Sequence, residues 1–507
     1  MNKKLIWIAC IILVIQAMIF AGGQKETDSM AAEKTGPVHN EYRGATYARY
    51  VFLFVGDGMG LPQVGAAEIY AGSLKDSAYP EAPRSLVFTA FPAQGITTTH
   101  DASSFITDSA SAGTAFACGH KTLTGVISMD VEKRIRYKSI ASYAKQQNMK
   151  VGIVSSVSID HATPAVFYAN QPSRSNMYEI ALNLADSGFD YFAGGSIVDP
   201  DGTKSTMENK PGNAFAYARS RGYRIVTTKE DILGLGRGSG KVWAITEKPA
   251  DASAMLYEVD RKSELSLADF TAKGIELLDN PNGFFMMVEG GKIDWACHAN
   301  DGLSAIKDVF AFDDAVKTAV KFAEAHPAET LIVVTGDHEC GGMTIGFAGT
   351  GYDTFFRKLQ GQELSFQMFN DVVAGLKENT PKAEFSAVLP YITRYFGLTA
   401  NGDGSALDLT EYEIRLLKDA FAETMKESDS RSAGEESKIL YGGYEPLTVT
   451  ITHILNRKAG IGWTTYSHTG VPVPTYASGT GEDLFNGYYD NTDIFYKLAA
   501  VMNIKTG

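Results

Sequence analysis

The chain of 507 residues is too long for one small core, but a large α/β sheet enzyme with insertions can occupy this length as one domain. Its formal charge of −13, from 59 acidic and 46 basic residues, argues against a surface that binds nucleic acid. An anionic substrate would therefore need locally bound cations, such as metal ions.

The N-terminal residues have the pattern of a secretory signal: two lysines, an apolar run at residues 5–20 and a small Ala-Gly-Gly step. We therefore expect a signal peptide at 1–23, a polar tether at 24–48 and a periplasmic or secreted protein. The apolar run is slightly shorter than a membrane-spanning helix, and polar chain follows it at once, so a retained anchor is the alternative. After cleavage, no stable membrane association is expected.

Four apolar runs have the composition of strands that are covered on both faces in a mainly parallel sheet. Each run leads to polar residues: 49–55 to Asp57, 151–154 to His161, 284–288 to Glu289, and 331–334 to Asp337 and His338. Because ligands of open α/β sheets bind at the carboxyl ends of the strands, we expect these polar side chains to gather at one edge.

Helical patterns fill the intervals between these runs. Apolar residues recur at helical spacing between residues 303 and 326, which is typical of a helix that covers a sheet. The fold class we predict is α/β, with a doubly wound, mostly parallel central sheet and helices on both faces. Between about 349 and 444, further helical stretches indicate an inserted helical cap within a domain at 49–500.

One loop of this insertion carries several oxygen-bearing side chains. Residues 399–405, followed by Asp408 and Glu411, have a faint likeness to a calcium-binding loop. The first ligand position lacks an acidic residue, and the glutamate falls one position late. We therefore favour a polar turn between helices.

Three cysteines remain after the expected processing, Cys118, Cys297 and Cys340. An odd number without short-range pairing is no disulfide framework. Cys297 adjoins His298, and Cys340 lies two residues after His338, so binding of zinc by a thiolate is conceivable. We favour small buried thiols for all three.

Ser109 is expected at the start of a helix, because Thr107-Asp108-Ser109 leads directly into small, helix-compatible residues. A serine at this place can cap the helix. It can also be a nucleophile, whose alkoxide and bound phosphate face the positive end of the helix dipole. Capping is the commoner role, but the other motifs of the chain favour the nucleophile.

Two sets of residues have the side chains of zinc ligands. Asp294 and His298 are four residues apart, so on a helix they would share one face, and His468 could supply a third ligand. The Asp-His pair at 337–338 follows a strand and could bind a second zinc ion together with Asp57. Each residue also has an ordinary alternative, such as a turn, a helix cap or a surface histidine. In combination they favour a metal site.

Five segments carry these acidic, histidine and small residues. They are 56–60 (Gly-Asp-Gly-Met-Gly), 107–109 (Thr-Asp-Ser), 289–298 (beginning Glu-Gly-Gly-Lys-Ile-Asp), 336–339 (Gly-Asp-His-Glu) and 467–470 (Ser-His-Thr-Gly). Together they resemble the alkaline phosphatase family, and the likeness runs from about Tyr50 to Tyr496. The resemblance implies an enzyme that hydrolyses small phosphomonoesters through a phosphoserine at Ser109 and releases inorganic phosphate. A homodimer, common in the family, is the alternative to a monomer.

The resemblance further implies two zinc ions and one magnesium ion. One zinc site would be formed by Asp294, His298 and His468, and the other by Asp57, Asp337 and His338, with Ser109 as a variable ligand. The magnesium ion would be held by Asp57, Thr163 and Glu289, which offer the oxygen ligands that a hard ion requires. Arg174 matches the phosphate-binding arginine of the family, whose guanidinium would hold two phosphoryl oxygens in a fork.

Two positions differ from the familiar enterobacterial pattern. That pattern has aspartate and lysine where this chain has His161 and Trp295. With histidine and tryptophan there, the chain is more similar to the animal enzymes and some marine bacterial ones. We expect both to bind substrate. A lysine would add a positive charge near the phosphate, and an aspartate would bind the magnesium ion and the arginine more firmly. This chain lacks both, so we expect it to retain product phosphate more weakly.

Two other interpretations stay open. One is a phosphodiesterase or sulfatase of the same superfamily. Sulfatases need a modifiable Cys or Ser followed by Pro and Arg, which the segment at 109–113 lacks, and diesterases commonly use Thr and lack the magnesium triad. The other is an exported metal- or phosphate-binding protein without turnover, which would have the metal ligands but no competent Ser109. No nucleic acid is expected as a dedicated partner.

Overall fold

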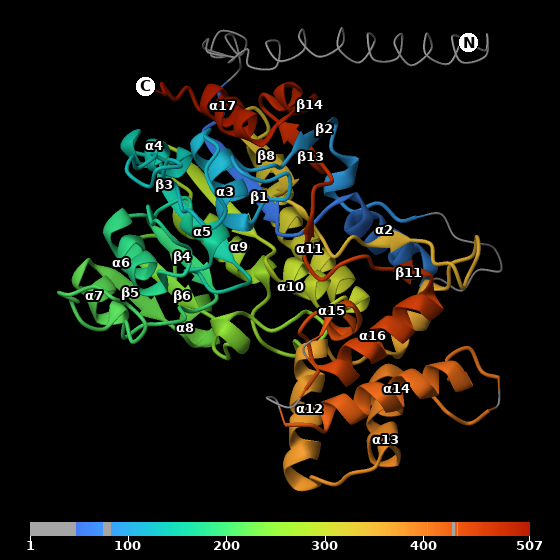
Figure 1. Ribbon diagram of the computed structural model, residues 1–507. Coiled ribbons are helices and arrows are strands. Elements are labelled where there is room, and N and C mark those ends of the chain that lie inside the picture. Colours follow the sequence, from blue (N-terminus) through green and yellow to red (C-terminus); the bar gives the residue numbers. More distant parts are fainter. Residues whose placement is uncertain (1–46, 75–82, 403, 428–430, 433, 507) are drawn as a thin grey trace, which may run out of the picture. The chain divides into compact units, whose positions relative to one another are not determined.

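The structure, a computed structural model, describes residues 47–74, 83–402, 404–427, 431–432 and 434–506 (Figure 1). The predicted signal peptide and nearly all of the predicted tether lie outside these residues. No helix within the described ranges is long and apolar enough to cross a membrane.

Within the described residues, a ten-stranded sheet forms the centre of the fold. In spatial order its strands are β14 (Gly487–Asp490), β2 (Ala93–Thr98), β13 (Val473–Gly479), β8 (Thr330–Gly336), β1 (Tyr50–Gly56), β7 (Phe284–Glu289), β3 (Lys150–Ser155), β4 (Tyr191–Gly194), β6 (Lys241–Ile245) and β5 (Tyr223–Val226). Neighbouring strands are parallel except at β13, which pairs antiparallel with β2 and β8. The four apolar runs predicted to be strands are β1, β3, β7 and β8, which are consecutive neighbours in this sheet.

Two apolar cores lie on the two faces of the sheet. Along β1, Phe52 and Phe54 belong to one core and Val51, Leu53 and Val55 to the other, and all five side chains are fully buried. Successive side chains of a strand point to opposite faces. Because both faces are covered, the strand is a continuous apolar run rather than an alternation of apolar and polar residues.

Helices cover both faces of the sheet, as Figure 1 shows. The first core is completed by α2 (Leu61–Ser73), α8 (Lys229–Leu233), α9 (Leu267–Leu278), α10 (Lys292–His298) and α11 (Gly302–Ala325), and the second by α3 (Ser109–Cys118), α4 (Ile140–Gln146), α5 (Ala162–Ala165), α6 (Met177–Ser187), α7 (Ala214–Ser220) and α17 (Asn491–Val501). Helix α11 occupies the residues where apolar spacing predicted a helix. The predicted fold class is thereby confirmed.

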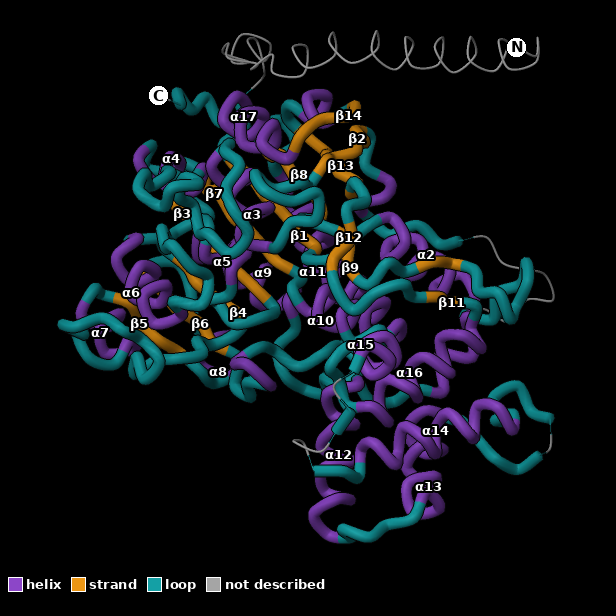
Figure 2. Tube along the Cα trace, viewed as in Figure 1, coloured by secondary structure: helices purple, strands orange, loops and turns teal. Residues whose placement is uncertain are grey.

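The region where the sequence indicates an insertion contains α12 (Phe366–Asn379), α13 (Phe385–Phe396), α14 (Glu411–Thr424) and α15 (Glu435–Tyr441). Figure 2 shows these helices together with α16 (Pro446–Ala459), and no labelled strand lies among them. The helical region therefore continues past residue 444, because α16 packs against α12 and α14. Buried side chains such as Val388, Leu417 and Ile451 belong to the first core, so these helices share a core with one face of the sheet.

The loop between α13 and α14 is organised around Asp408. Its Oδ1 accepts hydrogen bonds from the amides of Asn401 at 3.0 Å and Gly402 at 3.3 Å, and its Oδ2 accepts one from the amide of Gly404 at 3.2 Å. Carboxylate oxygens engaged in this way face backbone donors rather than a cation. This arrangement favours the polar turn over the calcium-binding loop.

Candidate metal centre and active site

The predicted polar side chains gather at the carboxyl edge of the central strands. Asp57 follows β1, Glu289 ends β7 and Asp337 follows β8, and β1 pairs in register with both neighbours, so the three strand ends align. His161 lies in the segment between β3 and α5. His468 comes from far along the chain through β12 (His468–Thr469), which pairs antiparallel with β9 (Glu339–Cys340). The fold thus brings distant segments to one edge, as the sequence predicted.

The first group of metal-ligating side chains is Asp294, His298 and His468. The four-residue spacing in α10 places His298 Nε2 3.3 Å from Asp294 Oδ2. His468 Nε2 lies 3.1 Å from His298 Nε2 and 3.6 Å from Asp294 Oδ1.

Hydrogen bonds to backbone carbonyls fix the orientation of the two imidazoles. His298 Nδ1 donates to the carbonyl of Tyr466 at 2.6 Å, and His468 Nδ1 donates to the carbonyl of Thr107 at 2.8 Å. Burial lowers the pKa of His298, but Asp294 and the Tyr466 carbonyl outweigh burial and raise it to about 9, so a bound cation would have to displace the proton on Nε2. In the neutral rings, with the proton on Nδ1, each Nε2 offers a lone pair. Two facing lone pairs beside a carboxylate are a donor set that suits zinc.

The second group, Asp57, Asp337 and His338, is buried. His338 Nε2 lies 3.4 Å from Asp57 Oδ1 and 3.2 Å from Asp337 Oδ2. These two carboxylate oxygens have no hydrogen-bond partner among the described residues. Burial and the surrounding carboxylates raise the pKa of Asp57 well above its usual value and the pKa of Asp337 to about 8. A divalent cation would relieve this repulsion and engage the unpartnered oxygens.

A third group of oxygen atoms includes the other Asp57 oxygen. Thr163 Oγ1, on α5, donates to Asp57 Oδ2 at 3.3 Å, and Ser155 Oγ donates to Glu289 Oε2. Glu289 Oε1 is buried, has no hydrogen-bond partner in the described part of the chain, and lies 3.9 Å from His161 Nδ1. Carboxylate and hydroxyl oxygens of this kind suit a magnesium ion, with His161 at the rim of the group.

Ser109 is the first residue of α3 but does not cap the helix. The N-cap is Asp108, whose carboxylate accepts a hydrogen bond from the amide of Ser111 at 3.0 Å. Ser109 Oγ is buried and lies 3.4 Å from His338 Nε2, at the edge of the second group. The capping alternative for Ser109 is therefore excluded, and its hydroxyl lies at the positive end of the helix, where an anion is stabilised.

Arg174 reaches the same place from the segment before α6. Its Nη1 donates to Asp108 Oδ2 at 2.9 Å, and its Nη2 lies 2.9 Å from His161 Nε2. The ring of Trp295 meets the His161 ring nearly edge-on at a centroid distance of 6.1 Å. Burial raises the pKa of Asp108, but Arg174 and the hydrogen bonds from Ser111 outweigh burial and lower the pKa, so the carboxylate is ionised at neutral pH. This role of Asp108 as the partner of the arginine was not predicted from the sequence, although its place beside Ser109 was a signal.

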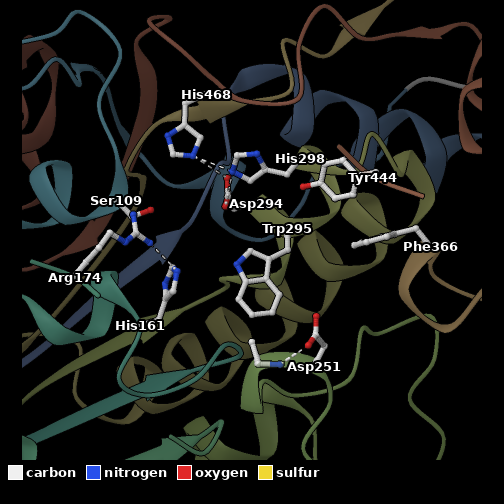
Figure 3. Close-up of a pocket in the computed structure, with 11 residues that line it drawn as sticks. Ser109, His161, Arg174, Asp251, Asp294, Trp295, His298, Phe366, Tyr444 and His468 are labelled. Carbon is white, nitrogen blue, oxygen red and sulfur yellow. Dashed lines mark hydrogen bonds and ion pairs between the residues drawn. The ribbon is translucent and has the colours of Figure 1, made fainter. Parts of the chain in front are cut away.

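A cavity of about 570 Å³ connects these parts (Figure 3). Its lining residues are Ser109, His161, Arg174, Asp251, Ala252, Asp294, Trp295, His298, Phe366, Tyr444 and His468. Ser109 and Arg174 lie at one end, Tyr444 and Phe366 at the other, and Asp294 and His298 between them. Asp251, Phe366 and Tyr444 were not predicted from the sequence, because no local pattern marks a side chain that reaches a site only through the tertiary fold.

The three cysteines are free and buried. Cys340 is close to the first metal-ligating group, since its sulfur and the ligand atoms of Asp294, His298 and His468 lie within 4.8 Å of one another. Its thiol contacts the Asp294 carbonyl at 3.7 Å, and burial raises its pKa well above the usual value. The protonated thiol is consistent with the favoured interpretation of small buried cysteines.

Comparisons with known proteins agree with this geometry. The family model described as alkaline phosphatase matches residues 48–504. The chain is 33% identical to alkaline phosphatase 4 of Bacillus subtilis (strain 168), with 100% of this chain and 98% of that protein covered. It is 30% identical to alkaline phosphatase 3 of the same organism, over 97% of this chain and 95% of that one. Among solved structures, the cold-active alkaline phosphatase from a psychrophilic Shewanella sp. is similar, with a TM-score of 0.71, 28% identity, and coverage of 89% of this chain and 99% of that chain.

Proposed function

The chain belongs to the alkaline phosphatase family of metal-dependent phosphoric monoester hydrolases, and from this premise we propose that it forms a phosphoserine at Ser109 and releases inorganic phosphate. The observation that carries the proposal is the position of Ser109 Oγ. It lies 3.4 Å from His338 Nε2, at the N-terminus of α3, in the same cavity as Arg174. A hydroxyl so placed can attack a phosphoryl group and become its covalent carrier.

We propose that two zinc ions bind, one to Asp294, His298 and His468, and one to Asp57, Asp337 and His338, with Ser109 as a variable ligand. A magnesium ion would bind to Asp57, Thr163 and Glu289. The residues fit these ions, because one or more carboxylate oxygens in each group are buried and have no hydrogen-bond partner among the described residues. When bound, the zinc ions would supply Lewis-acid stabilisation of the oxygens that enter and leave phosphorus.

The protein's own groups would bind and orient the phosphoryl group. The guanidinium of Arg174 can hold two phosphoryl oxygens, since its fork is held by Asp108 on one side and contacts His161 on the other. The amides at the start of α3 face the same region and stabilise negative charge there. Trp295 packs against His161 and keeps that ring in contact with the arginine.

We also propose export to the periplasm or the medium after cleavage of residues 1–23, on the pattern of the N-terminal sequence. The remaining chain would comprise a tether at 24–48 and a catalytic domain at 49–500. N-terminal sequencing of the mature protein would test this part.

The activity is tested with three aryl esters, a phosphate monoester, a phosphate diester and a sulfate, each with and without a chelator. We expect hydrolysis of the monoester, its loss on chelation, and its return on addition of zinc with magnesium. Return with magnesium alone would contradict the two zinc sites. Preference for the diester or the sulfate would indicate another activity of the superfamily, and tight metal binding without turnover would indicate a binding protein.

A further inference from the structure

The end of the cavity away from Ser109 is built from three aromatic rings and one carboxylate. Figure 3 shows Trp295, Tyr444, Phe366 and Asp251 arranged around this end, and we call these four side chains the aromatic box. The rings of Phe366 and Tyr444 are 6.0 Å apart and meet at 82°, so they form two walls at nearly a right angle. None of the four is a proposed metal ligand, and only Trp295, through its contact with His161, adjoins the residues that would bind the phosphoryl group.

The box is fixed to the metal-ligating residues by well-defined contacts. Trp295 directly follows Asp294 in α10. Tyr444 stacks at 6.1 Å on the ring of Tyr466, whose carbonyl accepts the hydrogen bond from His298. Phe366 begins α12, and its ring packs at 5.6 Å against Tyr257. The box is therefore held by the side chains and backbone that also orient the first metal-ligating group.

In the proposed reaction, the box faces the leaving group of the substrate. An oxygen that attacks phosphorus in line lies opposite the oxygen that leaves. Ser109 is at one end of the cavity, so the alcohol portion of a bound monoester points to the other end. This step of the argument depends on the proposed function.

Asp251 gives the box a negative charge that has no direct ion-pair partner among the described residues, although the buried Lys292 attracts it from a distance. Its carboxylate accepts a hydrogen bond from the amide of Ala252 at 2.8 Å. Ala252 and Ser253 have φ values of 48° and 62°, a conformation that costs energy for residues other than glycine. The chain thus holds an exposed carboxylate at the mouth of the cavity on a strained turn.

Lys292 is a cation beside the box, and it does not line the cavity. It is fully buried, with Nζ 3.6 Å from the Tyr257 ring centroid and 4.8 Å from that of Trp295, and it donates to Gln367 at 3.2 Å. The carboxylates of Asp308, Asp260 and, least strongly, Asp251 offset its charge. Lys292 does not line the cavity, so the charge that a ligand in the box meets first is that of Asp251.

We propose that the aromatic box binds a cationic leaving group, so that the enzyme favours phosphomonoesters of alkylammonium alcohols, and above all of quaternary ammonium alcohols such as choline. Aromatic faces attract a cation that has lost its water, and quaternary ammonium groups are the ligands that such boxes suit best. The carboxylate adds charge complementarity at the rim. A planar neutral leaving group would use the rings but gain nothing from Asp251.

The test compares two substrates of the same shape. They are phosphocholine and its neutral isostere, in which a tert-butyl group replaces the trimethylammonium group. The quantity measured is the ratio of their kcat/KM values in the zinc- and magnesium-loaded enzyme and in the variants Phe366→Leu and Asp251→Asn. Comparing this ratio between wild type and variant cancels the different acidity of the two alcohols.

We expect the ratio to fall about fivefold in Phe366→Leu and about threefold in Asp251→Asn, and the effect of Asp251→Asn to shrink with added salt. Asp371→Asn is the matched control, because it removes an exposed carboxylate from α12, which also carries Phe366, and should leave the ratio unchanged. The zinc content of each variant shows whether the metal centre is intact. If Phe366→Leu does not fold, Asp251→Asn still tests the inference, because it changes a surface residue and leaves the core unchanged.

A ratio that stays the same in both box variants, or falls equally in Asp371→Asn, would overturn the inference. An aryl phosphate monoester is included as a reference. If the enzyme hydrolyses this reference but shows no such change in ratio, only the cationic subsite is wrong. If it does not hydrolyse the reference with metals bound, the proposed function fails first.

Discussion

The contact between His161 and Arg174 leads to a specific prediction for the release of product phosphate. In the double variant His161→Asp with Trp295→Lys, a carboxylate replaces the imidazole that now lies 2.9 Å from the arginine. The new ammonium would start from a ring position 6.1 Å away from His161, close enough to pair with that carboxylate or to approach the phosphate. The ammonium adds attraction for phosphate, whereas the carboxylate repels phosphate but can pair with Arg174 and with the ammonium.

The expected magnitude follows from the separation of the charges. Two unit charges about 6 Å apart interact by about 2.8 kcal/mol at an effective dielectric constant of 20. The added carboxylate opposes the attraction of the ammonium for phosphate, and if it offsets about half, some 1.4 kcal/mol remains, which is about tenfold in affinity. We therefore expect the inhibition constant of inorganic phosphate to fall about tenfold. If phosphate release limits turnover, kcat should fall with it.

The assay is steady-state hydrolysis of an aryl phosphate at alkaline pH, with inorganic phosphate as the inhibitor. The single variants are the controls. In Trp295→Lys alone, the new ammonium has no carboxylate partner at 161 and lies near Lys292, whose pKa burial already lowers to about 8, so we expect a lower melting temperature than in the double variant. Unchanged or weaker phosphate inhibition in the double variant would refute the reasoning and show that these two side chains do not control product release.

Two further predictions concern stability. Burial raises the pKa of Asp490, but Lys121 at 3.0 Å and the hydrogen bonds from Thr492 outweigh burial and lower it. The wild type should therefore be more stable than Asp490→Asn by about 1 kcal/mol at pH 7. Thermal melts should show this advantage disappearing as the pH falls below about 4 through the folded-state pKa. An advantage that does not decrease as the pH falls below about 4 would exclude the ionised pair. Deleting residues 398–411 and bridging the gap removes the buried Leu398 and Leu409. The deletion should lower the melting temperature or change substrate access without loss of zinc. A purified variant that lacks zinc would contradict the separation of this loop from the metal centre.

The sequence predicted the sheet edge because the relevant signals are local. A strand covered on both faces must be a continuous apolar run, and the polar residue that ends it must lie at the carboxyl edge. Asp57, Glu289 and Asp337 were found in this way, and the pair Asp294 and His298 was found from helical spacing alone.

The residues that the sequence analysis missed depend on contacts between distant segments. Asp108 is marked as a helix cap by its neighbours, but its ion pair with Arg174 spans 66 positions of the chain. Phe366 and Tyr444 come from the helical region after β8, whose folding onto the cavity has no local pattern. The extension of this region through α16 was missed for the same reason, since the apolar face of α16 fits either a strand or a helix until its partners α12 and α14 are known.

The central claim is that Ser109 carries the phosphoryl group, and trapping the phosphoenzyme tests it most directly. The zinc- and magnesium-loaded enzyme is mixed with an aryl phosphate, quenched in acid and digested, and the modified residue is located by mass spectrometry. The account predicts phosphate on Ser109 in the wild type, and neither phosphoenzyme nor near-wild-type turnover in a Ser109→Ala variant that retains its zinc. Phosphate on another residue, or a Ser109→Ala variant that keeps near-wild-type turnover, would contradict it.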